Sequence, residues 1–223
     1  ARCTHPRFTC FRSAGPATGG GRSVTKIAVV SAGLGDPSTT RMLADAFAAK
    51  VHELAPATAV EVFGLRDLAH DIVDATLAGF ASPRLQSVIE SVQQADGVIV
   101  VSPIYQASYS GLFKSFFDAF ENDSLIGKPV LTAATGGTAR HSLAIEYALK
   151  PMFSYLQTVL VPTGVFASPH DWGSNGERAL DTRIERAVRE LLSLVEGHGT
   201  GRSFDDSIDL FSETMLSISD PIS

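Results

Sequence analysis

Short apolar runs alternate with amphipathic stretches between about residues 26 and 196. The runs have the length and apolar content of buried strands, and in the stretches between them apolar residues recur at helical spacing. Residues 64–83 show neither pattern and are expected to be irregular. The pattern predicts strands at 27–30, 60–63, 97–101, 129–134 and 161–167, and helices at 38–54, 84–94, 111–120, 142–157 and 175–196.

This order of elements defines an α/β fold class. Strands that are apolar on both faces, separated by amphipathic helices, are typical of a parallel sheet covered by helices on both sides. Ligands of such sheets bind outside the carboxyl ends of the strands, where the winding direction reverses. We therefore expect a site in the loops after the first, third and fourth strands.

The two ends of the chain differ from the predicted domain at 25–196. Residues 1–24 carry arginines but no acidic residue, and we interpret them as a disordered leader or an expression-derived segment; an organelle transit peptide is an alternative. Residues 197–203 read as a linker. Beyond it an amphipathic helix is expected to dock on its own domain or on a partner subunit, and its apolar residues are Phe204, Ile208, Phe211 and Met215.

Composition narrows the range of partners. A net charge of -6 argues against nucleic acid, whose phosphates require a basic face. No apolar stretch reaches the roughly 18 to 20 residues of a membrane helix. The two cysteines, Cys3 and Cys10, form no recognisable redox pair, which is consistent with a cytoplasmic protein. With His5 they make only a weak metal-ligand set, and we predict no metal site.

The loop at 31–41 places Ser38, Thr39 and Thr40 at the start of a predicted helix. Hydroxyls, unpaired amides and the positive end of the helix dipole together favour an anion. Neither a Walker loop nor the G-x-G-x-x-G fingerprint is present, which favours the phosphate of a mononucleotide. A simple helix N-cap is the alternative. Asp36 is unfavourable beside phosphate, and is expected either to turn outward or to pair with Arg41.

The loops at 102–111 and 135–141 supply different features. The first holds Tyr105 and Tyr109 with proline and small residues, which suit a flat aromatic ligand; a buried aromatic corner is the alternative. The second holds Gly136 and Gly137, whose missing side chains let the backbone approach a ligand closely; a plain turn is the alternative.

At these loops the chain resembles the NAD(P)H-dependent FMN reductases, specifically the branch that supplies reduced flavin to two-component sulfonate monooxygenases. The resemblance covers about residues 26–167. The matching segments are Pro103-x-Tyr105, 108–114 with Asp118, 134–137 with His141, 146–151 and 164–167.

The resemblance implies a flavodoxin-like three-layer sandwich whose five-stranded parallel sheet has the order 2-1-3-4-5. Many relatives carry an arginine in the first loop where this chain has Leu34, Gly35 and Asp36, a departure that suits weakly held, exchangeable flavin. The FMN phosphate is expected on Ser31, Ser38, Thr39 and Thr40, and the isoalloxazine ring on Pro103, Ile104, Tyr105, Gln106, Ser108, Thr135, Gly136, Gly137 and Thr138.

The function implied is transfer of hydride from NADPH or NADH to FMN, with reduced flavin passed to a partner flavin-dependent monooxygenase. Hydride transfer between two cofactors requires no acid, base or nucleophile from a side chain, so no catalytic side chain is predicted. Two alternatives remain: an FMN-containing quinone, azo or metal-ion reductase, and a non-enzymatic flavodoxin-like electron carrier.

Pro151 lies inside the helix predicted at 142–157. It lacks an N–H, and its ring clashes with the preceding turn, so the helix must form a π-bulge or a kink there. Relatives that resemble this chain bulge at this place and assemble as dimers or tetramers through the helix. The resemblance therefore implies a homodimer or homotetramer with Tyr147 near the interface.

Overall fold

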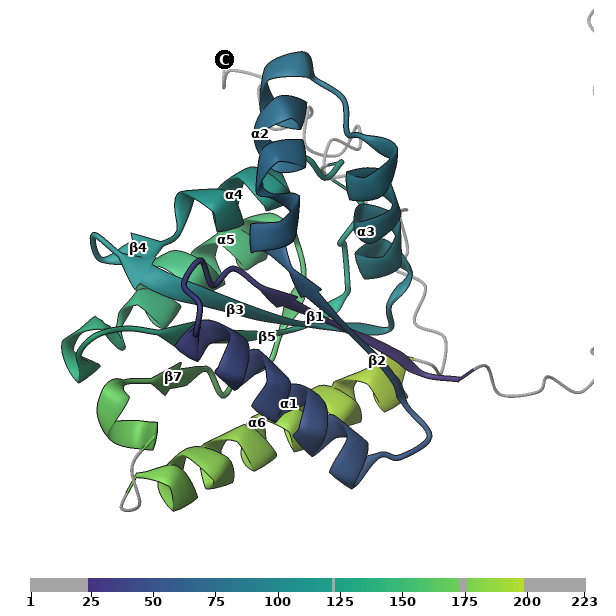
Figure 1. Ribbon diagram of the computed structural model, residues 1–223. Coiled ribbons are helices and arrows are strands. Elements are labelled where there is room, and N and C mark those ends of the chain that lie inside the picture. Colours follow the sequence, from purple (N-terminus) through teal and green to yellow (C-terminus); the bar gives the residue numbers. More distant parts are fainter. Residues whose placement is uncertain (1–23, 122, 173–175, 199–223) are drawn as a thin grey trace, which may run out of the picture.

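A parallel sheet forms the centre of the computed structural model, which describes residues 24–121, 123–172 and 176–198 (Figure 1). The leader and the amphipathic helix expected at 204–215 lie outside these residues. Within the described ranges, no helix is both long and apolar enough to cross a bilayer.

The strand order is β2-β1-β3-β5-β6, which confirms the predicted order 2-1-3-4-5. The fifth strand, predicted at 161–167, is divided into a segment at 159–160, before the predicted range, and one at 165–167, because Pro162 lacks an N–H for the sheet and interrupts pairing. Both halves pair in parallel with β5. The strands are β1 (Lys26–Ser31), β2 (Ala59–Gly64), β3 (Gly97–Tyr105), β5 (Pro129–Thr135), β6 (Val159–Leu160) and β7 (Val165–Ala167).

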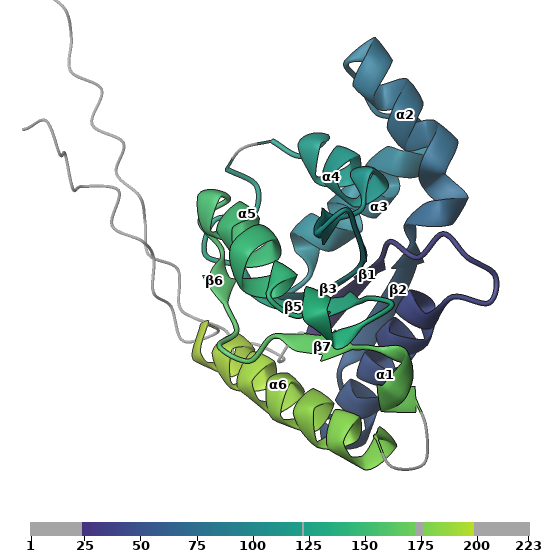
Figure 2. The same cartoon turned by 90° about the vertical axis from the view of Figure 1, so that its left-hand side faces the viewer.

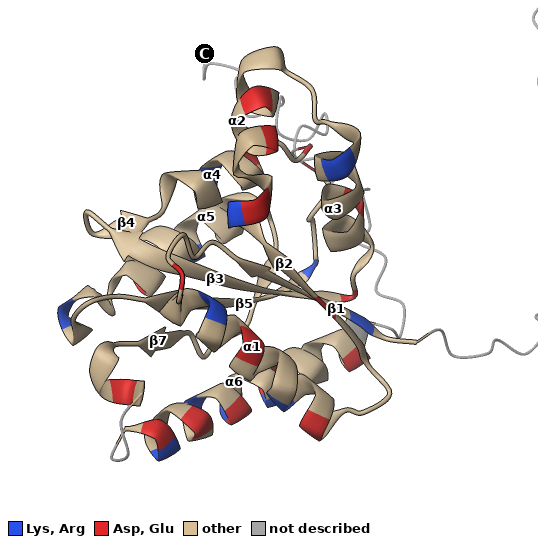
Figure 3. Ribbon diagram, in the orientation of Figure 1, with Lys and Arg blue, Asp and Glu red and all other residues tan. Residues whose placement is uncertain are grey.

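Helices cover both faces of the sheet (Figures 1 and 2). One face packs on α1 (Thr39–Leu54) and α6 (Glu177–His198), with Phe47, Leu131 and Leu191 fully buried between them. Charges of both signs are interspersed along the outer side of α6 (Figure 3). The other face is covered by α2 (Ala69–Ala78), α3 (Pro83–Gln94), α4 (Gly111–Asp118) and α5 (Lys150–Tyr155).

The expectation of irregular structure at residues 64–83 is wrong. A 3₁₀ turn, η1 (Leu65–Leu68), leads into α2. Buried Leu68, Ile72 and Ala75 have helical spacing, but exposed Leu77 and Phe80 on the remaining surface obscure that period in the sequence.

The helix predicted at 142–157 is not one regular α-helix. It follows a 3₁₀ turn (Ala139–His141) and contains a π-helical turn, η3 (Ile145–Leu149), before α5. The Lys150 N–H donates to the Ile145 carbonyl, five residues back, so of the two expected alternatives, a π-bulge or a kink, the structure has the π-bulge. A Cβ on Gly164, in the segment between β6 and β7, would lie 2.5 Å from Cγ2 of Ile145. The missing side chain at Gly164 therefore makes room for this turn.

Other boundaries are also corrected. α6 begins at Glu177 and continues to His198, so the linker predicted from residue 197 starts too early; helix ends are poorly defined by periodicity. More than half of the loop expected at 102–111 is sheet. β3 continues to Tyr105 and turns back into β4 (Ser108–Tyr109), because Ile104 and Tyr105 prolong the β-forming run.

Candidate functional site

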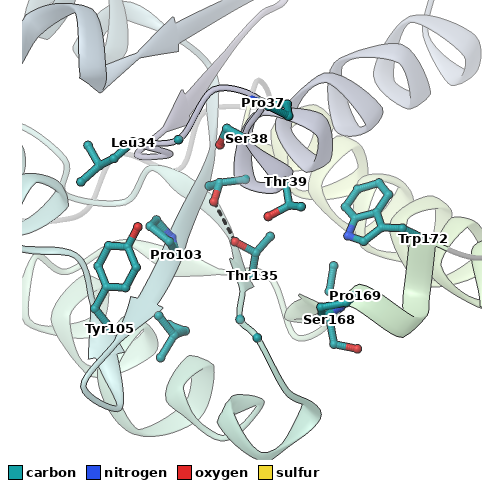
Figure 4. A pocket seen from close by; sticks show the side chains of 16 residues that line it. Leu34, Pro37, Ser38, Thr39, Pro103, Tyr105, Thr135, Ser168, Pro169 and Trp172 are labelled. Atoms are coloured by element: carbon teal, nitrogen blue, oxygen red, sulfur yellow. Dashed lines mark hydrogen bonds between the residues drawn. The ribbon is translucent and has the colours of Figure 1, made fainter.

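The carboxyl ends of β1, β3, β5 and β7 surround an open cleft of about 270 Å³ (Figure 4). Its walls come from four loops that are far apart in sequence. It is lined by Leu34, Gly35, Pro37, Ser38, Thr39, Thr40, Pro103, Ile104, Tyr105, Thr135, Gly136, Gly137, Ala167, Ser168, Pro169 and Trp172.

The first wall is the start of α1. Ser38 is its N-cap, and the Ser38 Oγ accepts a hydrogen bond from the Arg41 N–H at 3.2 Å. The amides of Thr39 and Thr40 belong to the first turn, where a helix supplies no carbonyl acceptor, so they remain available to an anion. The N-cap interpretation and the anion interpretation of this loop are therefore compatible.

A buried hydroxyl pair joins the first wall to the third. The Thr40 and Thr135 Oγ1 atoms lie 2.7 Å apart, and both residues are almost fully buried. This one hydrogen bond spans the start of a helix and the end of a strand. The pair therefore fixes the start of α1 against the end of β5.

We expect Thr40→Val and Thr135→Val each to destabilise the fold by about 1–3 kcal/mol, because each leaves one buried hydroxyl without its partner. The double variant removes both hydroxyls and should cost less than the sum of the two. Urea unfolding of the four proteins measures this coupling. Additive effects would show that the two hydroxyls do not interact.

Asp36 turns outward and is exposed, outside the lining of the cleft. The Arg41 side chain pairs with Asp45 one turn along α1, at 2.8 Å between Nε and Oδ1. Of the two arrangements expected for Asp36, the structure has the outward one. Its carboxylate is thus not part of the cleft lining, to which the hydroxyls of the first wall belong.

The second wall is the β3–β4 hairpin. The Ser102 Oγ accepts from the Ser110 N–H at 3.1 Å and donates to the Pro103 carbonyl at 2.9 Å, which secures the base of the hairpin. Tyr105 is half exposed at the rim. The turn residues Gln106 and Ala107 have positive φ angles of 48° and 65°, the geometry of a tight two-residue hairpin.

The third wall follows β5. The Gly136 N–H donates to the Ala167 carbonyl at 3.1 Å, which ties this loop to the end of β7. A Cβ on Gly136 would lie 2.9 Å from the Phe166 ring, whereas a Cβ on Gly137 would meet nothing within 4 Å. Gly136 is thus needed for packing, and Gly137 leaves open backbone beside the cleft.

The structure brings most of the predicted site residues together in the cleft. Ser31 is the buried last residue of β1 and does not line the cleft, and the Thr138 Oγ1 accepts from the Arg140 N–H at the following turn. The predicted residues that line the cleft are Ser38, Thr39, Thr40, Pro103, Ile104, Tyr105, Thr135, Gly136 and Gly137; those outside the lining are Ser31, Gln106, Ser108 and Thr138.

Sequence reasoning missed the fourth wall, which extends from Ala167 to Trp172 after β7. The Asp171 carboxylate holds this turn. Its Oδ2 accepts from the Ser168 N–H at 2.8 Å and from the Ser168 Oγ at 2.6 Å, and its Oδ1 pairs with Arg183 of α6. The predicted topology could have indicated this wall, because the carboxyl end of the fifth predicted strand lies at the same sheet edge as those of the others.

These contacts set the pKa of Asp171. Burial raises the pKa of the carboxyl, but the hydrogen bonds from Ser168 and the Arg183 guanidinium outweigh it and hold the pKa below its ordinary value. A carboxyl whose pKa is depressed in the folded state stabilises the fold above its unfolded pKa. That stabilisation is lost as the pH falls through the folded pKa.

Asp171→Asn should therefore lower the free energy of unfolding at pH 7 by about 1–2 kcal/mol, since solvent screens part of the ion pair. The difference from wild type should shrink below about pH 4, the unfolded pKa of Asp. Denaturant titrations at several pH values measure it, with Asp45→Asn as the surface control. A difference that does not change with pH would contradict this assignment.

Three features meet at one sheet edge: hydrogen-bond donors at a helix start that suit a phosphate, an aromatic hairpin and an open glycine turn. Together they define a flavodoxin-like nucleotide-binding protein. The model of the NADPH-dependent FMN reductase family matches residues 25–173, and the chain belongs to that family. The predicted resemblance to FMN reductases is thereby confirmed, and the protein is an oxidoreductase.

Individual relatives agree with this assignment. The chain is 41% identical over 175 residues to the FMN reductase (NADPH) of Pseudomonas aeruginosa, covering 77% of this chain and 93% of the relative. It is 37% identical to the NADH-dependent FMN reductase SfnF of Pseudomonas putida, covering 74% and 90%. A solved oxidoreductase from Corynebacterium diphtheriae superposes with a TM-score of 0.74 at 40% identity, covering 78% and 98%.

Proposed function

We propose that the cleft binds FMN with its phosphate at the start of α1 and its isoalloxazine ring between the second and third walls. The observation that carries this proposal is the convergence of Ser38, Thr39 and the open backbone at Gly137 on one cleft. Hydroxyls and first-turn amides suit a phosphate dianion. Tyr105 and Pro103 offer flat apolar surface to a ring.

The size of the cleft supports shallow binding. Its volume of about 270 Å³ lies just below the usual range for small-molecule sites, so a molecule as large as FMN extends beyond it. One edge of the flavin ring then remains accessible. Such access suits both the approach of a nicotinamide and the release of flavin.

FMN, when bound, supplies the hydride acceptor, and NADPH or NADH supplies the hydride. The protein's part is to bind and orient. The backbone of Gly136 and Gly137 allows close approach to the ring, and the half-exposed Tyr105 bounds the open side. Roles for Ser31, Gln106, Ser108 and Thr138 remain predictions from the family resemblance.

We further propose that the reduced flavin is passed to a flavin-dependent monooxygenase in the cytoplasm. The names SfnF and SfnE among the relatives support a place in that branch of the family. A homodimer or homotetramer is also proposed, with the side chains of Leu143, Tyr147 and Tyr155, all more than half exposed, at the contact. Analytical ultracentrifugation measures the mass of the assembly directly.

The test of the function mixes purified protein with NADPH or NADH and follows absorbance at 340 nm, with and without added FMN. We expect nucleotide oxidation that increases with FMN concentration. Riboflavin and a quinone, supplied separately, serve as acceptor controls. Tightly bound FMN with no turnover by either nucleotide would instead indicate an electron carrier, and faster turnover with the quinone than with free FMN would indicate a quinone reductase.

A further inference from the structure

The fourth wall places the only tryptophan of the chain against the cleft. One side of the Trp172 indole packs on the apolar cluster between α1 and α6. In Figure 4 its ring nitrogen is turned toward the cleft, on the side where Thr39 lies. Among the described residues, no acceptor for this indole N–H is found.

The position of this ring is fixed by its neighbours. Asp171 is held by both the N–H and the hydroxyl of Ser168 and by the Arg183 guanidinium. Arg183 also donates to the Phe166 carbonyl at 3.1 Å, so α6 secures the turn at two points. The turn is thus constrained, and the indole packs on the apolar cluster beside it, so its N–H is largely oriented before any ligand arrives, which lowers the entropic cost of using it.

The charge of the cleft lining indicates which kind of ligand this N–H can bind. Among the described residues, no lysine or arginine lines the cleft, and Arg41 is paired with Asp45. An anion at the start of α1 must therefore be held by neutral donors. The Ser38 hydroxyl accepts from the Arg41 N–H and can still donate its own proton, as one of these neutral donors.

We propose that the Trp172 indole N–H donates a hydrogen bond to the phosphate of FMN and so contributes, beside the hydroxyls of the first wall, to distinguishing FMN from riboflavin. This inference rests on the proposed binding of FMN in the cleft. Hydrogen bonds to an ionised acceptor are the stronger kind, and riboflavin has no phosphate to accept one.

The first test uses Trp172→Phe, which keeps an aromatic ring for packing but removes the N–H. We expect the dissociation constant for FMN to rise about tenfold, as for loss of one charge-assisted hydrogen bond. The constant for riboflavin should stay within about twofold. Phe80→Leu, which changes an exposed aromatic ring outside the cleft lining, is the control and should change neither constant.

The second test needs no variant. Because the chain has one tryptophan, its ¹H–¹⁵N spectrum contains one indole cross-peak. Saturating FMN should move this peak downfield, and riboflavin should move it less. A peak that responds equally to both flavins, or a Trp172→Phe variant that weakens both equally, would overturn the inference and leave the proposed function intact. Failure of wild type to bind either flavin would instead overturn the proposed function.

Discussion

Replacement of Gly33 by alanine is expected to weaken FMN binding by at least about tenfold, because it displaces the hydroxyls of the first wall. A Cβ at this position would lie 2.1 Å from the Ser38 Oγ and 3.0 Å from the Thr40 Cβ. Ser38 would have to rotate away from the Arg41 N–H that it caps. Loss of such a cap alone costs about 0.5–2 kcal/mol of stability.

Flavin titration by fluorescence measures the affinity, and thermal unfolding measures the loss of the cap. Gly111→Ala is the matched control, since a Cβ there meets nothing within 4 Å and Gly111 does not line the cleft. It should change neither quantity appreciably. Unchanged FMN affinity in Gly33→Ala would show that the hydroxyls at the start of α1 do not hold the phosphate.

The features of the fold that were predictable are those set by local pattern. The apolar run of β3 and the helical spacing in α1 each depend on residues near one another in sequence. Both bounds of α1 and the start of β3 were therefore located to within a few residues, whereas β3 continues beyond its predicted end. α2 was missed because the exposed Leu77 in it and Phe80 just after it resemble core residues. Their exposure is a property of the folded surface, which periodicity alone does not reveal.

In the candidate site, too, features set by local sequence were predictable and features set by the tertiary fold were not. Glycines and hydroxyls at strand ends predicted three walls, since parallel strands present their carboxyl ends at one edge. The pairing of Thr40 with Thr135, 95 residues apart, depends on strand order and register and has no local signal. Trp172 has none either, because it follows a short strand through a turn whose stability comes from Arg183 on α6.

Phe113→Ala is expected to destabilise the fold by about 3–5 kcal/mol, the range for removing a fully buried aromatic ring. Phe113 lies at the centre of an aromatic cluster on the α4 side of the sheet. Its ring centroid is 4.9 Å from that of Phe117, 5.7 Å from Tyr109 and 6.2 Å from Phe153. Truncation leaves a cavity that three surrounding rings, each packed on other neighbours, fill poorly.

The effect should extend to the cleft, because Tyr109 pairs with Ile104 in the hairpin that forms the second wall. Urea unfolding measures the free energy of unfolding. FMN titration at low temperature, where the variant remains folded, measures the FMN affinity and so reports on the position of the hairpin. Phe80→Ala removes the same ring from an exposed position and should stay within about 0.5 kcal/mol of wild type. Equal losses in the two variants would mean that the aromatic cluster does not stabilise the fold, and normal FMN affinity in Phe113→Ala would mean that the hairpin keeps its position without Phe113.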